Sequence, residues 1–259
     1  MKSSPDLLPA ERQNRILDLL REKGSVRVAS LSEEFDVSEI TIRRDLDNLE
    51  QRNLLERTHG GAVRSRHLRV EPLYTEKYRE QFEAKKRIGR AAAALVDPGE
   101  AIFVNSGSTT LQIFQHLGGR GVRVTTSNAG AITECQDLDV DLVLTGGAYR
   151  GQSHSFVGPI ALHSLQQVCA SKTFIGVDGI SLRYGLTTPS LEEAEVARAM
   201  MDYTHGDVII VADHTKAGRV ADSITAPLDK VDVIVTDAAF DPDYRQQLEK
   251  QGIRVIIAD

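Results

Sequence analysis

Apolar residues recur at helical spacing in three stretches near the start of the chain. The first stretch ends before Lys23-Gly24, where the glycine favours a helix stop. The second is short, and the third is expected to begin near Glu39, with Ser38 placed to cap it. This pattern predicts three helices around one small core. The apolar positions are Ile16, Leu17 and Leu20, then Val28, Leu31 and Phe35, then Ile42, Leu46 and Leu49.

The third predicted helix carries an unusual outer face. At about 100° per residue and with buried Ile42 as zero, Ile40 falls near 160° and Arg44 near 200°. Thr41 and Arg43 lie on the two flanks. An exposed isoleucine beside paired arginines suits a helix in the major groove, where arginine binds guanine or phosphate and isoleucine contacts a thymine methyl.

A β-hairpin is predicted directly after these helices. Two short extended segments, 54–57 and 62–64, flank the turn Gly60-Gly61. Three helices followed by a hairpin make a winged helix-turn-helix, which predicts double-stranded DNA as the partner. The alternative is a small helical domain that binds another protein. On the wing, near the phosphates, we expect Arg57, His59 and Arg64.

From residue 84 onward the pattern changes to apolar strands alternating with helices of about 10–15 residues. Continuous apolar strands of this kind indicate a parallel sheet covered on both faces. We therefore predict an α/β fold with domains at 1–64 and 84–259. Residues 65–83 are polar and contain Pro72, so we expect a linker whose charges are solvated. The predicted strands are 101–104, 122–125, 141–144, 173–177, 208–211, 233–235 and 255–257, and a helix is predicted at 87–96.

Small polar residues follow several of these strands, where ligands of parallel sheets collect. Asn105, Ser106, Gly107, Ser108, Thr109 and Thr110 come after the first strand and open a helix. Free backbone N–H groups, hydroxyls and a helix N-terminus favour a phosphate site there, although a helix cap without ligand is the alternative. The glycine patterns of P-loops and dinucleotide folds are absent. Other strand ends contribute Asn128, Gly147 with Arg150 nearby, Asp178 and Lys216, and Gly185–Pro189 is predicted to be a turn before a helix from Leu191.

Composition adds constraints but no partner. With 41% hydrophobic and 26% charged residues, the chain is typical of a soluble globular protein. Residues 1–66 hold twelve basic and twelve acidic residues, whereas 67–259 hold nineteen and twenty-five, so the net charge of −6 belongs to the second part. A neutral head with arginines gathered after residue 51 is compatible with DNA binding.

The sequence also predicts several absences. No apolar run reaches the length of a membrane span, and the N-terminus has no secretory pattern. Cys135 and Cys169 are expected to be buried without a disulfide, which favours the cytoplasm. No zinc-ligand spacing or Gly-x-Ser-x-Gly motif occurs. We expect no metal, cofactor or catalytic residue.

Several motifs together resemble one family. The segment Glu39–Leu49 followed by Arg57–Ala62 resembles the deoxyribose-operon repressor (DeoR) family of bacterial regulators. The resemblance extends over nearly the whole chain, through 106–110, 145–150, 176–180, 185–188 and 212–218.

This resemblance implies a winged helix-turn-helix and a C-terminal domain similar in fold to ribose-phosphate isomerases. It further implies a repressor of sugar or polyol genes that a phosphorylated sugar releases. Ser38, Thr41, Arg43 and Arg44 would then lie at the DNA groove. The implied effector site comprises Ser106, Gly107, Ser108, Thr109, Asp178 and Lys216. The chain departs from the family pattern at Asn105, Ala197 and Ala217, where aspartate, lysine and phenylalanine are common.

The alternative function is a sugar-phosphate isomerase with an added helical domain. Such an enzyme needs a placed carboxylate base, and related isomerases carry Asp-Gly-Ala-Asp-Glu. This chain has Asp178-Gly179-Ile180-Ser181-Leu182, without the second and third acids. We therefore expect a sensor rather than an enzyme, acting as a homodimer or homotetramer on a repeated operator.

Overall fold

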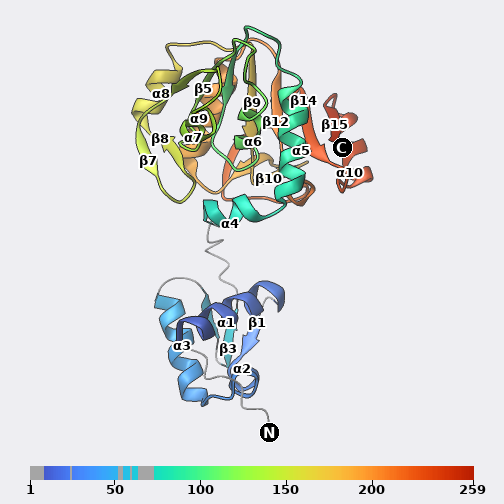
Figure 1. Cartoon of the computed structure of the whole chain (residues 1–259). Coiled ribbons are helices and arrows are strands. Elements are labelled where there is room, and N and C mark those ends of the chain that lie inside the picture. Colours follow the sequence, from blue (N-terminus) through green and yellow to red (C-terminus); the bar gives the residue numbers. More distant parts are fainter. Residues whose placement is uncertain (1–8, 24, 52–54, 59, 64–72) are drawn as a thin grey trace. The chain divides into compact units, whose positions relative to one another are not determined.

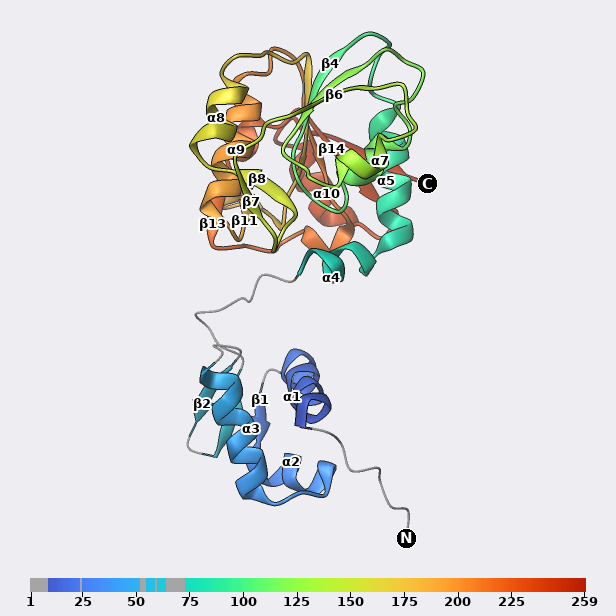
Figure 2. The same ribbon diagram turned by 60° about the vertical axis from the view of Figure 1, so that its left-hand side comes forward.

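The computed structural model describes residues 9–23, 25–51, 55–58, 60–63 and 73–259. The chain divides into two compact units, Met1–Glu71 and Pro72–Asp259 (Figures 1 and 2). Each unit has its own hydrophobic core. The division falls within the stretch that the sequence marks as a linker. The second unit already includes helix α4 (Tyr74–Arg79), inside that stretch.

The first unit has the elements of a winged helix-turn-helix. Strand β1, which the sequence analysis did not predict, pairs with the hairpin in the antiparallel order β1-β3-β2. Gly61 passes so close to this strand that a Cβ would lie 2.0 Å from the Val26 carbonyl oxygen, so a side chain cannot be accommodated there. The elements are α1 (Pro9–Lys23), β1 (Ser25–Arg27), α2 (Val28–Phe35), α3 (Glu39–Gln51), β2 (Glu56–Thr58) and β3 (Gly61–Val63).

A buried ion pair joins two helices of this unit. Arg12 Nε of α1 lies 2.6 Å from Asp45 Oδ2 of α3, and the two side chains are 8% and 7% exposed. Gln13 Nε2 donates to the other carboxylate oxygen of Asp45 at 3.1 Å. Fully buried Ile42, Leu46 and Leu49 lie on α3 and pack in the core as predicted.

A seven-stranded parallel sheet forms the centre of the second unit. Its strand order is β15-β14-β12-β9-β4-β5-β6, and all its pairings are parallel. All seven predicted strands are present in this sheet, so the predicted α/β fold class is confirmed. The strands are β4 (Ala101–Val104), β5 (Arg123–Thr126), β6 (Asp141–Leu144), β9 (Lys172–Gly176), β12 (Val208–Val211), β14 (Val233–Asp237) and β15 (Arg254–Ala258).

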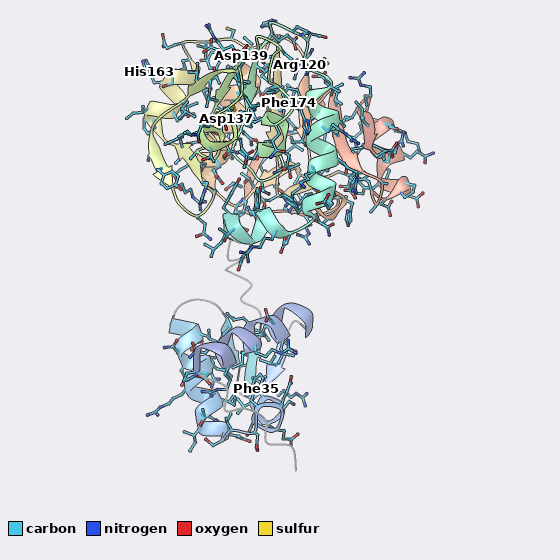
Figure 3. All side chains as sticks on the ribbon, viewed as in Figure 1. Phe35, Arg120, Asp137, Asp139, His163 and Phe174 are labelled. Atoms are coloured by element: carbon cyan, nitrogen blue, oxygen red, sulfur yellow. The ribbon has the colours of Figure 1, made fainter. Side chains whose placement is uncertain are left out.

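Helices cover both faces of the sheet because alternate strand residues point to opposite sides. Ile175 and Ile210 pack with α8, α9 and α10, whereas Phe174 and Ile209 pack with α5, α6 and α7. Figure 3 shows Phe174 inside the unit and His163 at its surface. The helices are α5 (Phe82–Ala93), α6 (Leu111–Phe114), α7 (Ala131–Glu134), α8 (Pro159–Leu165), α9 (Leu191–Asp202) and α10 (Pro242–Glu249).

Shorter strands accompany the main sheet. The predicted turn 185–189 is wrong, since Gly185–Thr188 is the fully buried strand β11, between β10 and β13. The helix expected from Leu191 is present as α9. The further elements are β7 (Ala148–Arg150), β8 (Ser155–Val157), β10 (Gly179–Ser181), β13 (Ser223–Ala226), and the 3-10 turns η1 (His214–Lys216) and η2 (Leu228–Lys230).

Two smaller predictions are also corrected. Helices α6 and α7 have only four residues each, far fewer than the predicted 10–15. Cys135 is buried as expected, but Cys169 is exposed because it lies just after α8, in the connection to β9. Both cysteines are free thiols.

The Arg12–Asp45 pair yields a stability prediction. Arg12→Met leaves the Asp45 carboxylate buried with an uncompensated charge, which should destabilise the first unit by about 3–5 kcal/mol. The additional change Asp45→Leu should recover most of this loss. Native-state hydrogen exchange of α1 and α3 amides in the full chain measures both effects. Arg15→Met on the exposed side of α1 is the matched control, and equal effects of the two methionine variants would contradict the prediction.

Candidate functional site

Helix α3 exposes both polar and apolar side chains to solvent at its N-terminal end. Ser38 caps the helix, because its Oγ accepts a hydrogen bond from the Thr41 N–H at 3.2 Å. The Ser38 and Thr41 hydroxyls lie 2.8 Å apart. Ile40 is 73% exposed, and Arg44 is exposed beside it. A cap, an isoleucine and an arginine therefore share one accessible end of the helix, as the helical spacing predicted.

The other predicted DNA contacts differ in accessibility. Arg43 is half exposed and forms an ion pair with Glu39 at 3.1 Å, one turn away. Arg57 is only 22% exposed, since its Nε lies 3.3 Å from Asp47 of α3. In this structure Arg57 therefore braces the hairpin against the helix. His59 and Arg64 lie outside the described residues.

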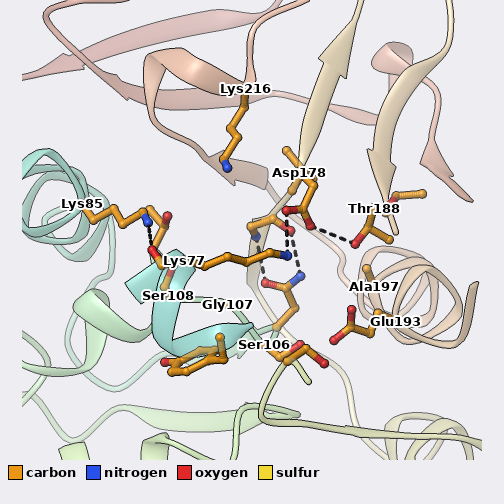
Figure 4. Close-up of a pocket in the computed structure, with 17 residues that line it drawn as sticks. Lys77, Lys85, Ser106, Gly107, Ser108, Asp178, Thr188, Glu193, Ala197 and Lys216 are labelled. Atoms are coloured by element: carbon orange, nitrogen blue, oxygen red, sulfur yellow. Dashed lines mark hydrogen bonds and ion pairs between the residues drawn. The ribbon is translucent and has the colours of Figure 1, made fainter. Parts of the chain in front are cut away.

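A pocket opens at the carboxyl edge of the parallel sheet in the second unit (Figure 4). The central strands β12, β9 and β4 are neighbours, so the loops that follow them meet at this edge. Of the predicted effector residues, Asn105, Ser106, Gly107, Ser108, Thr109, Asp178 and Lys216 line the pocket. The other lining residues are Tyr74, Lys77, Lys85, Ser153, Gly176, Val177, Thr188, Glu193, Ala197 and Thr225.

The loop after β4 is fixed by a side-chain amide. Asn105 Nδ2 donates to the Gly176 carbonyl at 3.0 Å, and the Gly176 N–H donates to Asn105 Oδ1 at 2.8 Å. The amide thus extends the β4–β9 pairing by one step beyond the strand. Aspartate, which is common at this position in the family that the sequence resembles, only accepts hydrogen bonds when ionised and cannot donate to the carbonyl.

Two predicted residues of this loop region lie beneath the pocket surface. The Thr110 hydroxyl donates to the Asn105 and Gly107 carbonyls at 2.9 and 3.1 Å. Asn128 is fully buried, donates to the Gly107 carbonyl at 3.1 Å and accepts from the Gly130 N–H at 3.0 Å. Both residues hold the loop in shape and do not line the pocket.

Gly147 and Arg150 do not line the pocket either. Gly147 has φ +108°, and a Cβ there would lie 2.6 Å from the Val157 carbonyl oxygen, so close packing explains this glycine. Arg150 Nη1 donates to Ser153 Oγ at 3.0 Å and lies 3.9 Å from Glu193. Arg150 therefore supports the pocket wall from behind.

Asp178 and Lys77 meet in the middle of the pocket (Figure 4). Lys77 Nζ lies 2.8 Å from Asp178 Oδ1, and Thr188 Oγ1 donates to Asp178 Oδ2 at 3.3 Å. Burial acts to raise the pKa of Asp178, but attraction to Lys77 and Lys216 and the two hydrogen bonds outweigh it, so this pKa lies below its usual value. Asp178 is therefore a carboxylate at neutral pH.

Two further lysines face the pocket. Lys85 is 2% exposed, and its Nζ donates to the Lys77 and Glu80 carbonyls, the latter at 2.7 Å. Burial lowers the pKa of Lys85 to about 8, against the attraction of Asp213. Lys216 is held by η1, whose start is capped by Asp213 accepting from the Thr215 N–H at 3.0 Å.

Several residues that line the pocket were not predicted from the sequence. Lys77 was placed among solvated linker charges, yet its side chain is only 16% exposed and paired with Asp178. Glu193 accepts from Ser155 Oγ at 2.7 Å and lines the pocket. The one available signal for Glu193 was its place in the first turn of a predicted helix. Nothing in the local sequence distinguishes Lys77 from its neighbours.

The described residues include no group of three or more His, Cys, Asp or Glu side chains that could hold a metal ion. In the same part of the chain, no helix combines the length and apolar character needed to cross a bilayer.

Comparison with known sequences agrees with this two-unit arrangement. Residues 12–67 match the DeoR-like helix-turn-helix domain, and residues 80–238 match the DeoR C terminal sensor domain.

Individual relatives match along nearly their whole length. The HTH-type transcriptional regulator GlpR of Haloferax volcanii is 33% identical over 96% of this chain and 98% of its own. The putative aga operon transcriptional repressor of Escherichia coli O157:H7 is 34% identical over 96% and 93%. The solved structures include a ribose 5-phosphate isomerase A of Methanocaldococcus jannaschii, with a TM-score of 0.40 and 16% identity over 53% of this chain and 55% of that one. A structural similarity of this size says nothing further about the chain. The two domain matches and these full-length relatives show that the chain belongs to the DeoR family of DNA-binding transcriptional regulators.

Proposed function

We propose that this regulator represses genes of sugar or polyol catabolism and that a phosphorylated sugar or polyol, bound in the pocket of the second unit, releases it from its operator. The family membership supports DNA binding, and one relative is a putative aga operon transcriptional repressor. The pocket itself supports the chemical class of the effector.

The observation that carries the proposal is the pairing of opposite chemistries in one pocket. One side offers Lys216, Lys85 and the Ser106–Thr109 loop, whose cations, hydroxyls and N–H groups suit a phosphate. The other offers the carboxylates of Asp178 and Glu193, which accept hydrogen bonds from hydroxyl groups. A small molecule with a phosphate at one end and several hydroxyls at the other satisfies both sides.

We further propose that the pocket binds without catalysis. The related isomerases carry an acid two positions after Asp-Gly, where this chain has Ser181, and Ile180 before it is fully buried in the core. Asp178 is occupied by Lys77 and Thr188, and Glu193 by Ser155. Attraction to Lys77 and Lys216 holds the pKa of Asp178 below its usual value, which makes this carboxylate a weak base for proton abstraction.

Two elements of the first unit, α3 and the wing, are available for contact with the operator. We propose that α3 enters the major groove with Ile40, Thr41, Arg43 and Arg44, and that Ser38 lies at its N-terminal end. The wing would contact the DNA phosphates through Arg57, His59 and Arg64. For this contact, Arg57 would have to break its ion pair with Asp47. A repeated operator needs two heads, so a homodimer or homotetramer is the proposed assembly.

The function is tested by fluorescence anisotropy on DNA from upstream of its own gene, at stated salt, with a panel of pentose, hexose and hexitol monophosphates. Specific binding at about 10⁻⁸–10⁻¹¹ M is expected, with release by at least one panel member. Incubating that member with the protein and following it by NMR separates binding from turnover. Operator affinity that no panel member changes would refute the sensor role, and conversion of the sugar would restore the isomerase alternative.

Arg44→Ala should weaken operator binding by about 1–3 kcal/mol if the side chain binds a base, and should reduce discrimination at that base. Arg183→Ala on the exposed surface of the second unit is the control and should leave operator affinity unchanged. Titrations on operators with single base changes provide the measurement. Full affinity and discrimination in Arg44→Ala would remove this residue from the DNA interface.

Ser108→Ala should weaken effector binding, because it removes a hydroxyl from the loop proposed to hold the phosphate. A hydrogen bond to a charged group contributes about 1.5–3 kcal/mol, so we expect the effector Kd to rise about tenfold or more. Isothermal titration calorimetry with the active panel member measures this change. Ser164→Ala on α8 is the control, and an unchanged Kd in Ser108→Ala would show that the phosphate binds elsewhere.

Effector affinity should depend on pH through Lys85. A phosphate monoester becomes a dianion above a pKa of about 6, which should raise affinity between pH 5 and 7. Lys85 has a pKa of about 8, so its ammonium loses the proton as pH rises further and the affinity for an anion should fall. Calorimetric titrations from pH 5 to 9.5 show both limbs. Lys85→Gln should lack the alkaline decline, and an equal decline in that variant would assign it to another group.

A further inference from the structure

A single residue of α4 is bound by three residues of the pocket. The Lys77 ammonium lies 2.8 Å from Asp178 Oδ1. The Lys77 carbonyl accepts hydrogen bonds from Ser108 Oγ at 3.3 Å and from Lys85 Nζ. The backbone and the side chain of Lys77 therefore both occupy groups that line the proposed effector site (Figure 4).

An effector with phosphate and hydroxyl groups would need the same partners. The Ser108 hydroxyl has one proton, so a hydrogen bond to a phosphate oxygen ends its donation to the Lys77 carbonyl. The Asp178 oxygen that accepts from Lys77 belongs to a carboxylate that lines the pocket. A sugar hydroxyl bound there competes with the ammonium. Lys77 thus fills the pocket partly as a ligand would.

Helix α4 depends on contacts of this kind for its stability. Six residues are far too few for an isolated helix to be stable in water. At its start, the Tyr74 N–H donates to the Gln152 carbonyl at 2.9 Å, and the Tyr74 ring stacks on His154 at 4.4 Å. At its end, Lys85 Nζ donates to the Glu80 carbonyl at 2.7 Å. The pocket contacts of Lys77 hold the middle.

We propose that Lys77 is an internal competitor of the effector: binding displaces its ammonium from Asp178 and its carbonyl from Ser108, and thereby releases α4. The inference rests on the proposed function, because it concerns how the effector binds in the same pocket. In sequence, α4 is the first described helix after the boundary between the units. Its release therefore alters the part of the sensor unit that continues into the chain toward the DNA-binding unit.

This arrangement also sets the specificity of the sensor. Inorganic phosphate can take Ser108 from the Lys77 carbonyl but leaves the Asp178 pair intact. A free sugar has the reverse effect. Only a molecule that carries both groups displaces Lys77 from Asp178 and from Ser108 together. The sensor then responds to the phosphorylated sugar but not to inorganic phosphate or to the free sugar alone.

The competition has a thermodynamic consequence. Effector binds the open pocket, so its apparent Kd equals the intrinsic Kd divided by the open fraction. A closed fraction of about nine tenths weakens the apparent affinity about tenfold. By linkage, whatever opens the pocket without effector strengthens effector binding and shifts the operator equilibrium in the same direction as the effector does.

Hydrogen exchange on the wild-type full chain tests the release directly. The Lys77 and Glu80 amides donate within α4, to the Leu73 and Glu76 carbonyls at 3.0 and 3.1 Å. With a saturating sugar monophosphate from the panel, these amides should exchange at least about tenfold faster, while those of α5 keep their protection. Inorganic phosphate alone should have little effect. Unchanged or slower α4 exchange in the bound protein would overturn the proposal.

Lys77→Met provides the second test, with Arg79→Met on the exposed side of the same helix as the matched control. The Lys77 variant should bind the sugar phosphate several-fold more tightly, bind the operator more weakly without effector, and show faster α4 exchange. Lys77→Arg, which keeps the charge, should behave nearly as wild type. Weaker effector binding in Lys77→Met would instead make Lys77 a direct ligand and overturn the proposal.

The outcomes separate this proposal from the function on which it rests. If no panel member binds the wild-type chain, the proposed function fails. If a sugar phosphate binds and releases the operator while α4 keeps its protection, the function stands and the competition is wrong. Should Lys77→Met fail to fold, as thermal unfolding would show, the wild-type exchange experiment still decides.

Discussion

The structure of the sensor unit depends on one constraint of parallel sheets, that all strands end at the same edge. Because β12, β9 and β4 are neighbours, residues from three distant parts of the chain meet there: the 105–110 loop, Asp178 and Lys216. Each strand is followed by different chemistry: hydroxyl groups after β4, the Asp178 carboxylate after β9 and the Lys216 ammonium after β12. The chemistry of this wall of the pocket is thus determined by strand order together with three short loops.

The same constraint explains what could be predicted from the sequence. The inner strands β4 and β12 are buried apolar runs, and the regular alternation with helices indicated the other strands, including the partly exposed β6. All seven were recognised, and their ends identified one wall of the pocket. The α3 face was equally accessible to prediction, because a helix places residues at fixed angles and leaves Ile40 and Arg44 opposite Ile42. In both cases a periodic pattern translates directly into position.

The remaining pocket wall has no such pattern. Lys77 lies on a helix of six residues, too short to show periodicity, and its partner Asp178 is about a hundred positions away. Strand β11 begins with a glycine and precedes Pro189, and these local turn signals concealed a buried strand. Gly147 and Arg150 are the reverse case: both were expected at the effector site, and in this structure Gly147 allows close packing while Arg150 supports Ser153. Tertiary contacts decide each of these cases.

The two walls of the pocket are held by contacts of different kinds, and the Asn105 amide holds one of them. It joins β4 to β9 beyond the ladder, so the wall that it supports moves only if the sheet opens. The α4 wall is held by the contacts of Tyr74, by the hydrogen bond from Lys85 to Glu80 and by the contacts of Lys77. Substitutions in the rigid wall can therefore change which molecule is bound while the competition by Lys77 is kept, and substitutions in α4 can change how strongly Lys77 opposes binding. Such a division lets a lineage of regulators acquire new ligands one residue at a time while each intermediate still responds.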